Sequence, residues 1–192
     1  MGHFILASEY SAAERKILLR LAQAAILYGL EQHAVMLVDL AQYSEKLTEN
    51  RACFVTLAMH GKLRGCIGSL EAHQALVKDI VYNAYAAAFT DPRFQPLTRK
   101  EYSQLEIHLS ILNTPESMQF SSETDLIRQL RPRIDGLILS DQGHRGTFLP
   151  SVWESVPEPQ EFLAHLKLKA GLPSNYWSET IAIQRYTVES IP

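Results

Sequence analysis

The chain has 192 residues, of which 46% are hydrophobic and 20% charged, and its formal net charge is -3. These values are typical of a globular chain with one domain, or with one domain and a smaller lobe, and they exclude an intrinsically disordered protein. Because no run of Lys and Arg is longer than two residues, we expect no nucleic-acid binding.

The cysteine content and the N-terminus together predict a cytoplasmic protein. Cys53 and Cys66 are the two cysteines and form no CxxC pair, which favours a reducing compartment. Residues 1–7 lack the basic flank and the long apolar stretch of a signal peptide. The apolar stretch 18–30 is too short to cross a bilayer, so we expect no membrane association.

The first predicted element is a helix over residues 12–28. Ser11 and Glu14 have the spacing of a capping box, and apolar residues follow at helical spacing. Gly29 is typical of a helix end. Residues 30–50 show no clear pattern.

A β-hairpin is predicted next. Residues 52–59 and 62–67 are both β-prone, and the dipeptide His60-Gly61 between them is typical of a tight turn. A second helix is predicted over 74–89, and the sequence Asp91-Pro92 follows its end.

In the rest of the chain, residues 98–101 form another capping box, and residues 105–112 alternate as a strand with one buried face. The remaining predicted elements are a helix at 123–130, a hairpin of 136–140 and 145–149, a helix at 159–170 and a strand at 181–188. Because the strands come as hairpins rather than in β-α-β order, we expect an α+β fold with a mainly antiparallel sheet flanked by helices.

The segment best suited to chemistry is the motif Leu63-Arg64-Gly65-Cys66-Ile67-Gly68. On a strand, Cys66 shares a face with Arg64 and Gly68, and the two glycines clear space that leaves its sulfur accessible. With β-carbons roughly 6.5–7 Å apart, Arg64 can lower the pKa of the Cys66 thiol or hold a carboxylate or phosphate. In the alternative interpretation, Cys66 is a packed apolar residue and the glycines let the helix over 74–89 lie against the sheet.

The second cysteine is predicted on the same sheet face. Pairing around the turn places residue 55 opposite residue 66, so that the β-carbons of Cys53 and Cys66 lie about 6–8 Å apart. This distance is too long for an unstrained disulfide, which leaves a resolving-cysteine role for Cys53 as a hypothesis.

Four other side chains are candidate binding residues. Arg93 can hold an anion near the motif or pair with Asp91. Glu106 and His108 lie on the polar face of their strand, which either is exposed or lines a cleft where His108 could act as a base toward Cys66. Arg145 can be an anion contact or a solvated surface residue.

Motifs for metals and nucleotides are missing from the sequence. It has no HxH, HExxH or Cys/His cluster, and no Walker loop, GxGxxG or GxSxG. We therefore expect neither a metal site nor a cofactor.

The 63–68 motif closely resembles the signature of the AMMECR family. Further stretches match the same family over nearly the whole chain: 54–57, 61–71, 86–94, 96–98, 105–112, 134–139, 146–150, 169–172 and 186–189. The resemblance implies a single AMMECR domain over 8–190 that divides into a larger lobe, which holds both termini, and a smaller lobe. It also implies Cys66 and Arg64 as the functional centre.

Prokaryotic relatives are named AmmeMemoRadiSam system protein A, which implies a Memo-type protein and a radical SAM protein as partners. Two hypotheses follow. The chain is a cysteine-dependent enzyme acting on a small anionic substrate, with Cys66 and Arg64 in catalysis and Leu63, Gly65, Ile67 and Gly68 in binding. Alternatively, it is a non-catalytic scaffold for a Memo-type partner, with Cys66 packed and inert.

Overall fold

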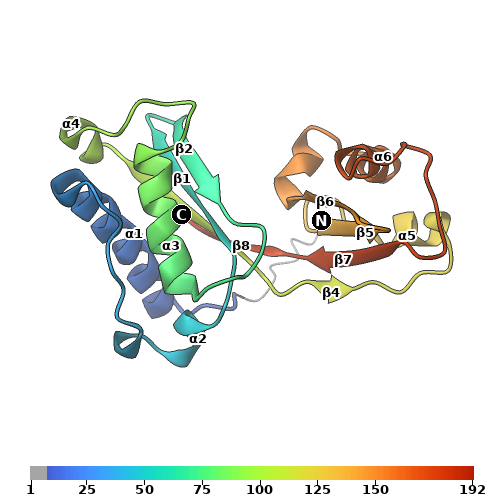
Figure 1. Ribbon diagram of the computed structural model, residues 1–192, viewed down its shortest axis with the longest axis horizontal. Coiled ribbons are helices and arrows are strands. Elements are labelled where there is room, and N and C mark those ends of the chain that lie inside the picture. Colours follow the sequence, from blue (N-terminus) through green and yellow to red (C-terminus); the bar gives the residue numbers. More distant parts are fainter. Residues whose placement is uncertain (1–7) are drawn as a thin grey trace. The chain divides into compact units, whose positions relative to one another are not determined.

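The computed structural model describes residues 8–192, and the expectation about a signal peptide concerns residues that lie outside this range. The described residues divide into two compact units (Figure 1). Of the described residues, the larger unit holds 8–112 together with Glu189–Pro192, and the smaller unit is Asn113–Val188.

In the larger unit, two helices cover one face of a four-stranded sheet. The strands are β1 (Cys53–Met59), β2 (Lys62–Gly68), β3 (Glu106–Leu112) and β8 (Val188–Ile191), in the order β2-β1-β3-β8. Helices α1 (Ala12–Gln32) and α3 (Leu76–Phe89) pack together and against this sheet (Figure 1). Three short helical segments complete the unit: η1 (Leu40–Gln42), α2 (Glu45–Thr48) and α4 (Arg99–Tyr102).

The smaller unit is built around a second four-stranded sheet. Its strands are β4 (Glu116–Ser117), β5 (Gly136–Asp141), β6 (His144–Phe148) and β7 (Ala182–Tyr186), in the order β4-β7-β5-β6, and its helical segments are α5 (Glu123–Gln129), η2 (Pro150–Glu154) and α6 (Pro159–Lys169). A separate core forms here, in which the rings of Trp153 and Phe162 stack 3.7 Å apart. Antiparallel pairing in both sheets confirms the predicted α+β class.

Helix α1 begins as predicted but ends later. Ser11 and Glu14 form the expected capping box. The prediction that Gly29 ends the helix was wrong, because α1 continues to Gln32. A β-carbon at Gly29 would lie 2.4 Å from the Phe89 ring of α3, so this glycine permits close helix packing instead of a helix end.

The last predicted strand is in fact two strands in different sheets. Residues 181–188 were predicted as one element, but β7 belongs to the smaller unit and β8 to the larger one. The chain leaves the sheet of the smaller unit at Thr187, whose carbonyl oxygen accepts a hydrogen bond from the Asn113 N–H at 2.9 Å. Because hydrophobic alternation continues through this junction, the sequence pattern does not show where β7 ends and β8 begins.

Candidate functional site

The predicted hairpin forms, with a change of register that sets the position of Cys66. His60 and Gly61 both have positive φ, as a tight turn of this kind requires. Met59 pairs with Lys62, but a β-bulge then makes Arg64 an extra residue in β2. Cys66 therefore lies opposite Thr56, and the predicted pairing with residue 55 was wrong.

The Cys66 sulfur lies on the outer face of the larger sheet, away from α1 and α3. It is half-buried, and the Thr56 hydroxyl lies 3.2 Å from it. On the other side of β1, His108 is in register with Thr56. Two strand spacings place the α-carbons of Cys66 and His108 about 10 Å apart, so the proposed contact of His108 with the sulfur is not made.

The backbone of Cys66 is fixed by the segment that follows α3. β2 is an edge strand, and the Asp91 carboxylate accepts a hydrogen bond from the Cys66 N–H at 2.9 Å. Arg93 donates to the Cys66 carbonyl at 3.2 Å and pairs with Asp91 at 2.7 Å. Both alternatives for Arg93 are thus present in part: it lies at the motif and it pairs with Asp91. Together the two side chains cover the exposed edge of the sheet.

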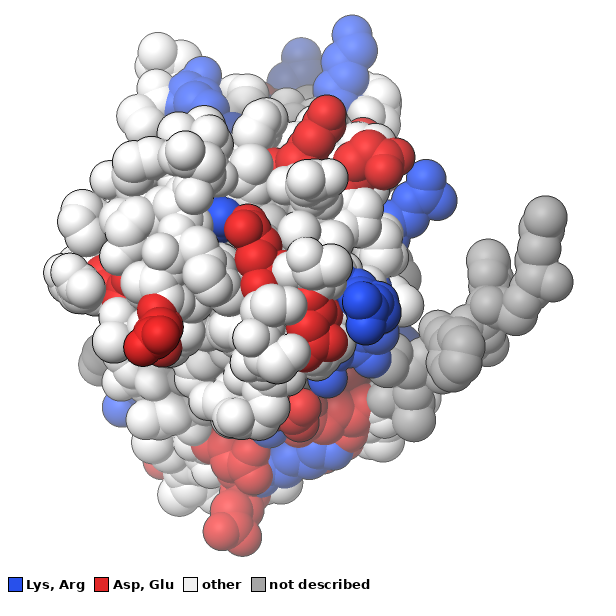
Figure 2. Space-filling model, turned by 90° about the vertical axis from the view of Figure 1, so that its right-hand side faces the viewer, with Lys and Arg blue, Asp and Glu red and all other residues white. Residues whose placement is uncertain are grey.

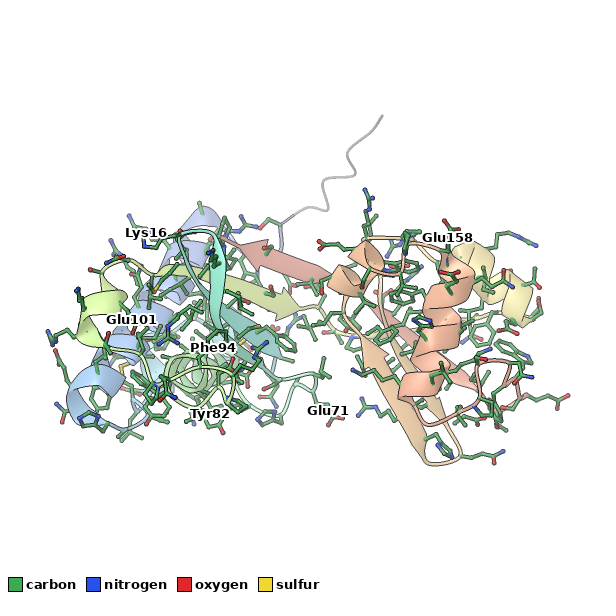
Figure 3. All side chains as sticks on the ribbon, turned by 90° about the horizontal axis from the view of Figure 1, so that it is seen from above. Lys16, Glu71, Tyr82, Phe94, Glu101 and Glu158 are labelled. Carbon is green, nitrogen blue, oxygen red and sulfur yellow. The ribbon has the colours of Figure 1, made fainter. Side chains whose placement is uncertain are left out.

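Arg64 is directed away from Cys66. Its Nε donates to Glu101 at 2.8 Å and its Nη2 to the Gln95 carbonyl at 2.9 Å. The guanidinium also lies 5.7 Å from the centre of the Phe94 ring (Figure 3 labels Phe94 and Glu101). The bulge explains the difference from the sequence expectation, since an extra residue breaks the alternation that would have placed Arg64 beside Cys66.

Hydrogen bonds from arginine side chains keep the carboxylates of Asp91 and Glu101 ionised. The hydrogen bond from Arg64 lowers the pKa of Glu101 to about 2. The hydrogen bond from Arg93, followed by that from the Cys66 N–H, holds the pKa of Asp91 well below its usual range. The guanidinium groups of Arg64 and Arg93 are thus each matched by an ionised carboxylate.

The two motif glycines serve packing. A β-carbon at Gly65 would lie 2.1 Å from the carbonyl oxygen of Ala87, so Gly65 lets α3 rest directly on β2. A β-carbon at Gly68 would lie 2.2 Å from the Phe54 ring. Neither glycine leaves open space around the Cys66 sulfur. The alternative interpretation, in which the glycines let the helix over 74–89 lie against the sheet, is correct for Gly65.

Cys53 occupies the opposite face of the sheet from Cys66. It is fully buried beneath α3, and burial raises the pKa of its thiol, with a further contribution from Asp79. The prediction of a shared face was wrong because the bulge shifts the register by one residue, which reverses the side of the sheet.

The remaining predicted site residues are dispersed. Leu63 is 46% exposed, whereas Ile67 packs against the core. Glu106 is exposed and lies opposite Ala58. Arg145 is on β6 of the smaller unit, outside the unit that contains Cys66.

A buried polar cluster near the start of α3 was not predicted. The Asp79 carboxylate is inaccessible and accepts hydrogen bonds at 3.0 Å each from the Cys53 N–H, Ser69, Gln74 and Asn83. Asp79 and Asn83 lie one helical turn apart among the buried residues of α3, a spacing that could have revealed them as a pair facing inward.

Neither a metal-binding cluster nor a membrane-spanning helix is present in residues 8–192. Within that range no group of three or more His, Cys, Asp and Glu side chains is arranged to hold a metal ion. Likewise, no helix in the same range has the length and apolar character needed to cross a membrane. On the face shown in Figure 2, acidic and basic side chains are intermixed.

Comparison with known proteins gives consistent matches. The AMMECR1 family profile matches residues 19–191. Protein MJ0810 of Methanocaldococcus jannaschii is 36% identical over 156 residues, which cover 79% of this chain and 78% of that protein. A Thermotoga maritima protein is 40% identical over 148 residues, covering 76% and 80%. The crystal structure of the uncharacterised protein PH0010 from Pyrococcus horikoshii superposes with a TM-score of 0.74 at 31% identity, covering 91% of this chain and 88% of that one.

Proposed function

This chain belongs to the AMMECR1 family, and we propose that it acts as a binding module that docks a protein partner on the outer face of the larger sheet. The docking surface is defined by half-buried side chains of three strands: Phe54, Thr56, Cys66, His108 and Ser110.

The observation that carries this proposal is the pairing of the two arginines next to Cys66, Arg64 of the motif and Arg93 of the segment after α3, with carboxylates. A catalytic thiol needs a nearby cation or base to become a thiolate at neutral pH. Arg64 is instead bound by Glu101, and Arg93 is bound by Asp91. These contacts hold the edge strand in a fixed shape, which lowers the entropic cost of docking a partner.

The partner that the family resemblance suggests is a Memo-type protein, and it is the first to test. Complex formation with the Memo-type protein of the same organism is measured by titration calorimetry for the intact chain. Ser110→Arg places a charge on the docking surface and should weaken the complex at least tenfold, or about 1.4 kcal/mol. The matched control is Tyr82→Arg, because Tyr82 is 54% exposed on α3 and lies on the helical side of the sheet.

The outcomes of this titration are distinct. Unchanged affinity for Tyr82→Arg, with loss for Ser110→Arg, supports docking on the outer face. Equal affinities for the two variants, or no complex with the unmodified chain, would refute it. Cys66→Ser should bind like the unmodified chain, because a docking surface does not need the thiol as a nucleophile. A radical SAM partner is tested with the same variants.

A second candidate is a cysteine-dependent enzyme that acts on a small anionic substrate. It is supported by the Thr56 hydroxyl, which lies 3.2 Å from the Cys66 sulfur and can donate a hydrogen bond to a thiolate. The rate of Cys66 alkylation against pH separates the two candidates. An apparent pKa well below about 8.5 favours the enzyme, and absence of reaction in the folded protein favours the binding module.

A further inference from the structure

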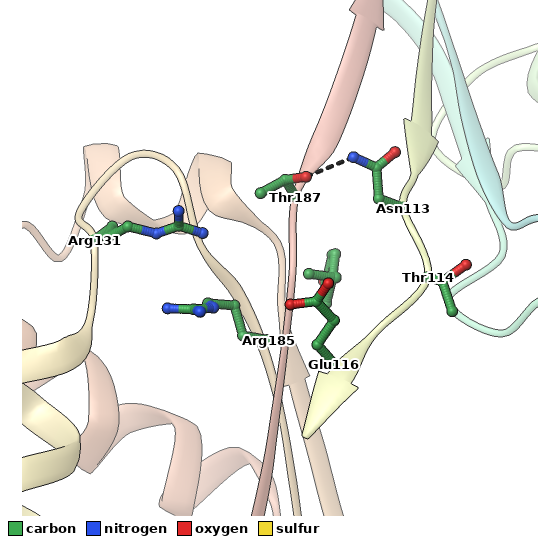
Figure 4. A pocket seen from close by; sticks show the side chains of 7 residues that line it. Asn113, Thr114, Glu116, Arg131, Arg185 and Thr187 are labelled. Carbon is green, nitrogen blue, oxygen red and sulfur yellow. Dashed lines mark hydrogen bonds between the residues drawn. The ribbon is translucent and has the colours of Figure 1, made fainter. Parts of the chain in front are cut away.

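The smaller unit contains a pocket of about 250 Å³ that the proposed function does not use. It is lined by polar and charged side chains from the turn before β4, from β4 and β7, and from the loop after α5 (Figure 4). The residues that matter for its chemistry are Asn113, Glu116, Arg131, Arg185 and Thr187.

Arg185 is the unsatisfied cation of this pocket. Its side chain and that of Arg131 extend into the same space in Figure 4. Arg131 is bound to the buried Asp135 at 2.6 Å, whereas within residues 8–192 no hydrogen bond or ion pair engages the Arg185 side chain. Arg185 is only half-exposed, so an anion that reaches its guanidinium gains a charge-assisted hydrogen bond away from bulk water.

Asn113 leaves a second group without a partner. Its Nδ2 donates to the Thr187 hydroxyl at 2.6 Å, but its Oδ1 is buried and accepts no hydrogen bond from any described residue. A buried carbonyl oxygen without a donor costs about 1–3 kcal/mol. Because this oxygen is inaccessible, a ligand in the pocket does not reach it, and Asn113 contributes to the pocket wall through its hydrogen bond to Thr187.

An acidic residue stands on the same wall as Arg185. Glu116 is the cross-strand neighbour of Arg185, and no ion pair joins the two side chains. The pocket therefore offers a free guanidinium for a negative group and a carboxylate for a positive N–H donor. This charge pattern is complementary to a zwitterion and less suited to a simple anion such as phosphate.

From these features we propose that the pocket binds a free amino acid or a similarly small aminocarboxylate. The ligand carboxylate is held by Arg185, and its ammonium group donates to the Glu116 carboxylate. A volume of about 250 Å³ is small for drug-sized ligands, which fill roughly 300–1,000 Å³, and fits a molecule of this size.

The test is a thermal-shift screen of the intact chain against each standard amino acid at millimolar concentration, followed by calorimetry on the best binder. Acetate, methylammonium and inorganic phosphate serve as single-charge probes. We expect one or more amino acids to bind at least tenfold more tightly than any of these probes. Arg185→Gln should weaken that binding at least tenfold, and Arg128→Gln, which removes an exposed charge of the same unit outside the pocket, should leave it unchanged.

Other results would overturn the proposal. Binding of phosphate or acetate as tightly as any amino acid excludes a zwitterion site, as does the absence of any binding. Equal affinities for the Arg185 and Arg128 variants would place the ligand elsewhere. Should Arg185→Gln fail to fold, Arg185→Lys and Glu116→Gln replace it, and unaltered affinity in both variants would refute the assignment. The docking variant Ser110→Arg in the larger unit should leave amino-acid binding unchanged.

Discussion

The contact between Gly65 and helix α3 can be tested with one methyl group. In Gly65→Ala the new β-carbon would lie 2.1 Å from the Ala87 carbonyl oxygen, whereas carbon and oxygen approach comfortably only to about 3.3 Å. Because the obstacle is helix backbone, α3 must retreat by about 1 Å. A gap of that size removes roughly a quarter to a half of the dispersion energy of the atoms across it.

The expected loss of stability is about 3 kcal/mol, at the upper end of overpacking substitutions. The matched control is Gly61→Ala in the same hairpin, where φ is +72° and the β-carbon would meet no atom within 4 Å. Its cost is the left-handed backbone alone, about 1 kcal/mol.

The assay is urea unfolding followed by far-ultraviolet circular dichroism. Both tryptophans, Trp153 and Trp177, belong to the smaller unit, so their fluorescence would not report on α3. With a slope of about 2 kcal/mol/M, the urea midpoint should fall by about 1.5 M for Gly65→Ala and 0.5 M for Gly61→Ala. Equal shifts for the two variants would refute the close-packing argument.

Two further predictions concern buried or paired carboxylates. The pKa of Glu101 is lowered from 4.5 to about 2 in the folded protein, so the folded protein binds this proton less readily than the unfolded chain does. The Arg64–Glu101 pair therefore stabilises the fold at pH values above the pKa of the unfolded chain, and this stabilisation is lost as the pH falls through the pKa of the folded protein. In Glu101→Gln the urea midpoint should therefore fall less steeply below about pH 5 than in the unmodified chain. The control is Glu31→Gln, in an exposed pair with Arg99, and it should keep the steep fall of the unmodified chain. Identical acid profiles for the two variants would contradict the Arg64–Glu101 assignment. Asp79→Ala leaves several buried donors without an acceptor and should cost about 3–4 kcal/mol, and a thermal-melt change equivalent to less than about 1 kcal/mol would show that the cluster is not structural.

The fold was largely predictable because its strongest signals are local. Capping boxes at Ser11 and Thr98 were both confirmed, and the His60-Gly61 turn was found as expected. The β-bulge at Arg64 was not predictable, since nothing in a strand's alternation shows where an extra residue is inserted. That single residue reversed the expected relation of Cys53 to Cys66 and turned Arg64 toward Glu101.

The environment of the motif was harder to predict because its partners are distant in sequence. Asp91 was identified from the sequence only as a pairing partner for Arg93, and Glu101 only as a capping residue. Glu101 in fact accepts hydrogen bonds from Thr98 and from Arg64 at the same time. Such double use depends on tertiary contacts that no spacing rule in the sequence describes.

The course of the chain between the two sheets has an engineering consequence. The polypeptide leaves the larger unit after Leu112 and re-enters it at Glu189, and the Asn113–Thr187 hydrogen bonds hold the outgoing and returning strands side by side. Residues 113–188 are therefore an insertion with adjacent ends, topologically equivalent to one long loop. A turn of a few residues in its place would leave the strand order β2-β1-β3-β8 unchanged, and each unit has a core cluster of its own.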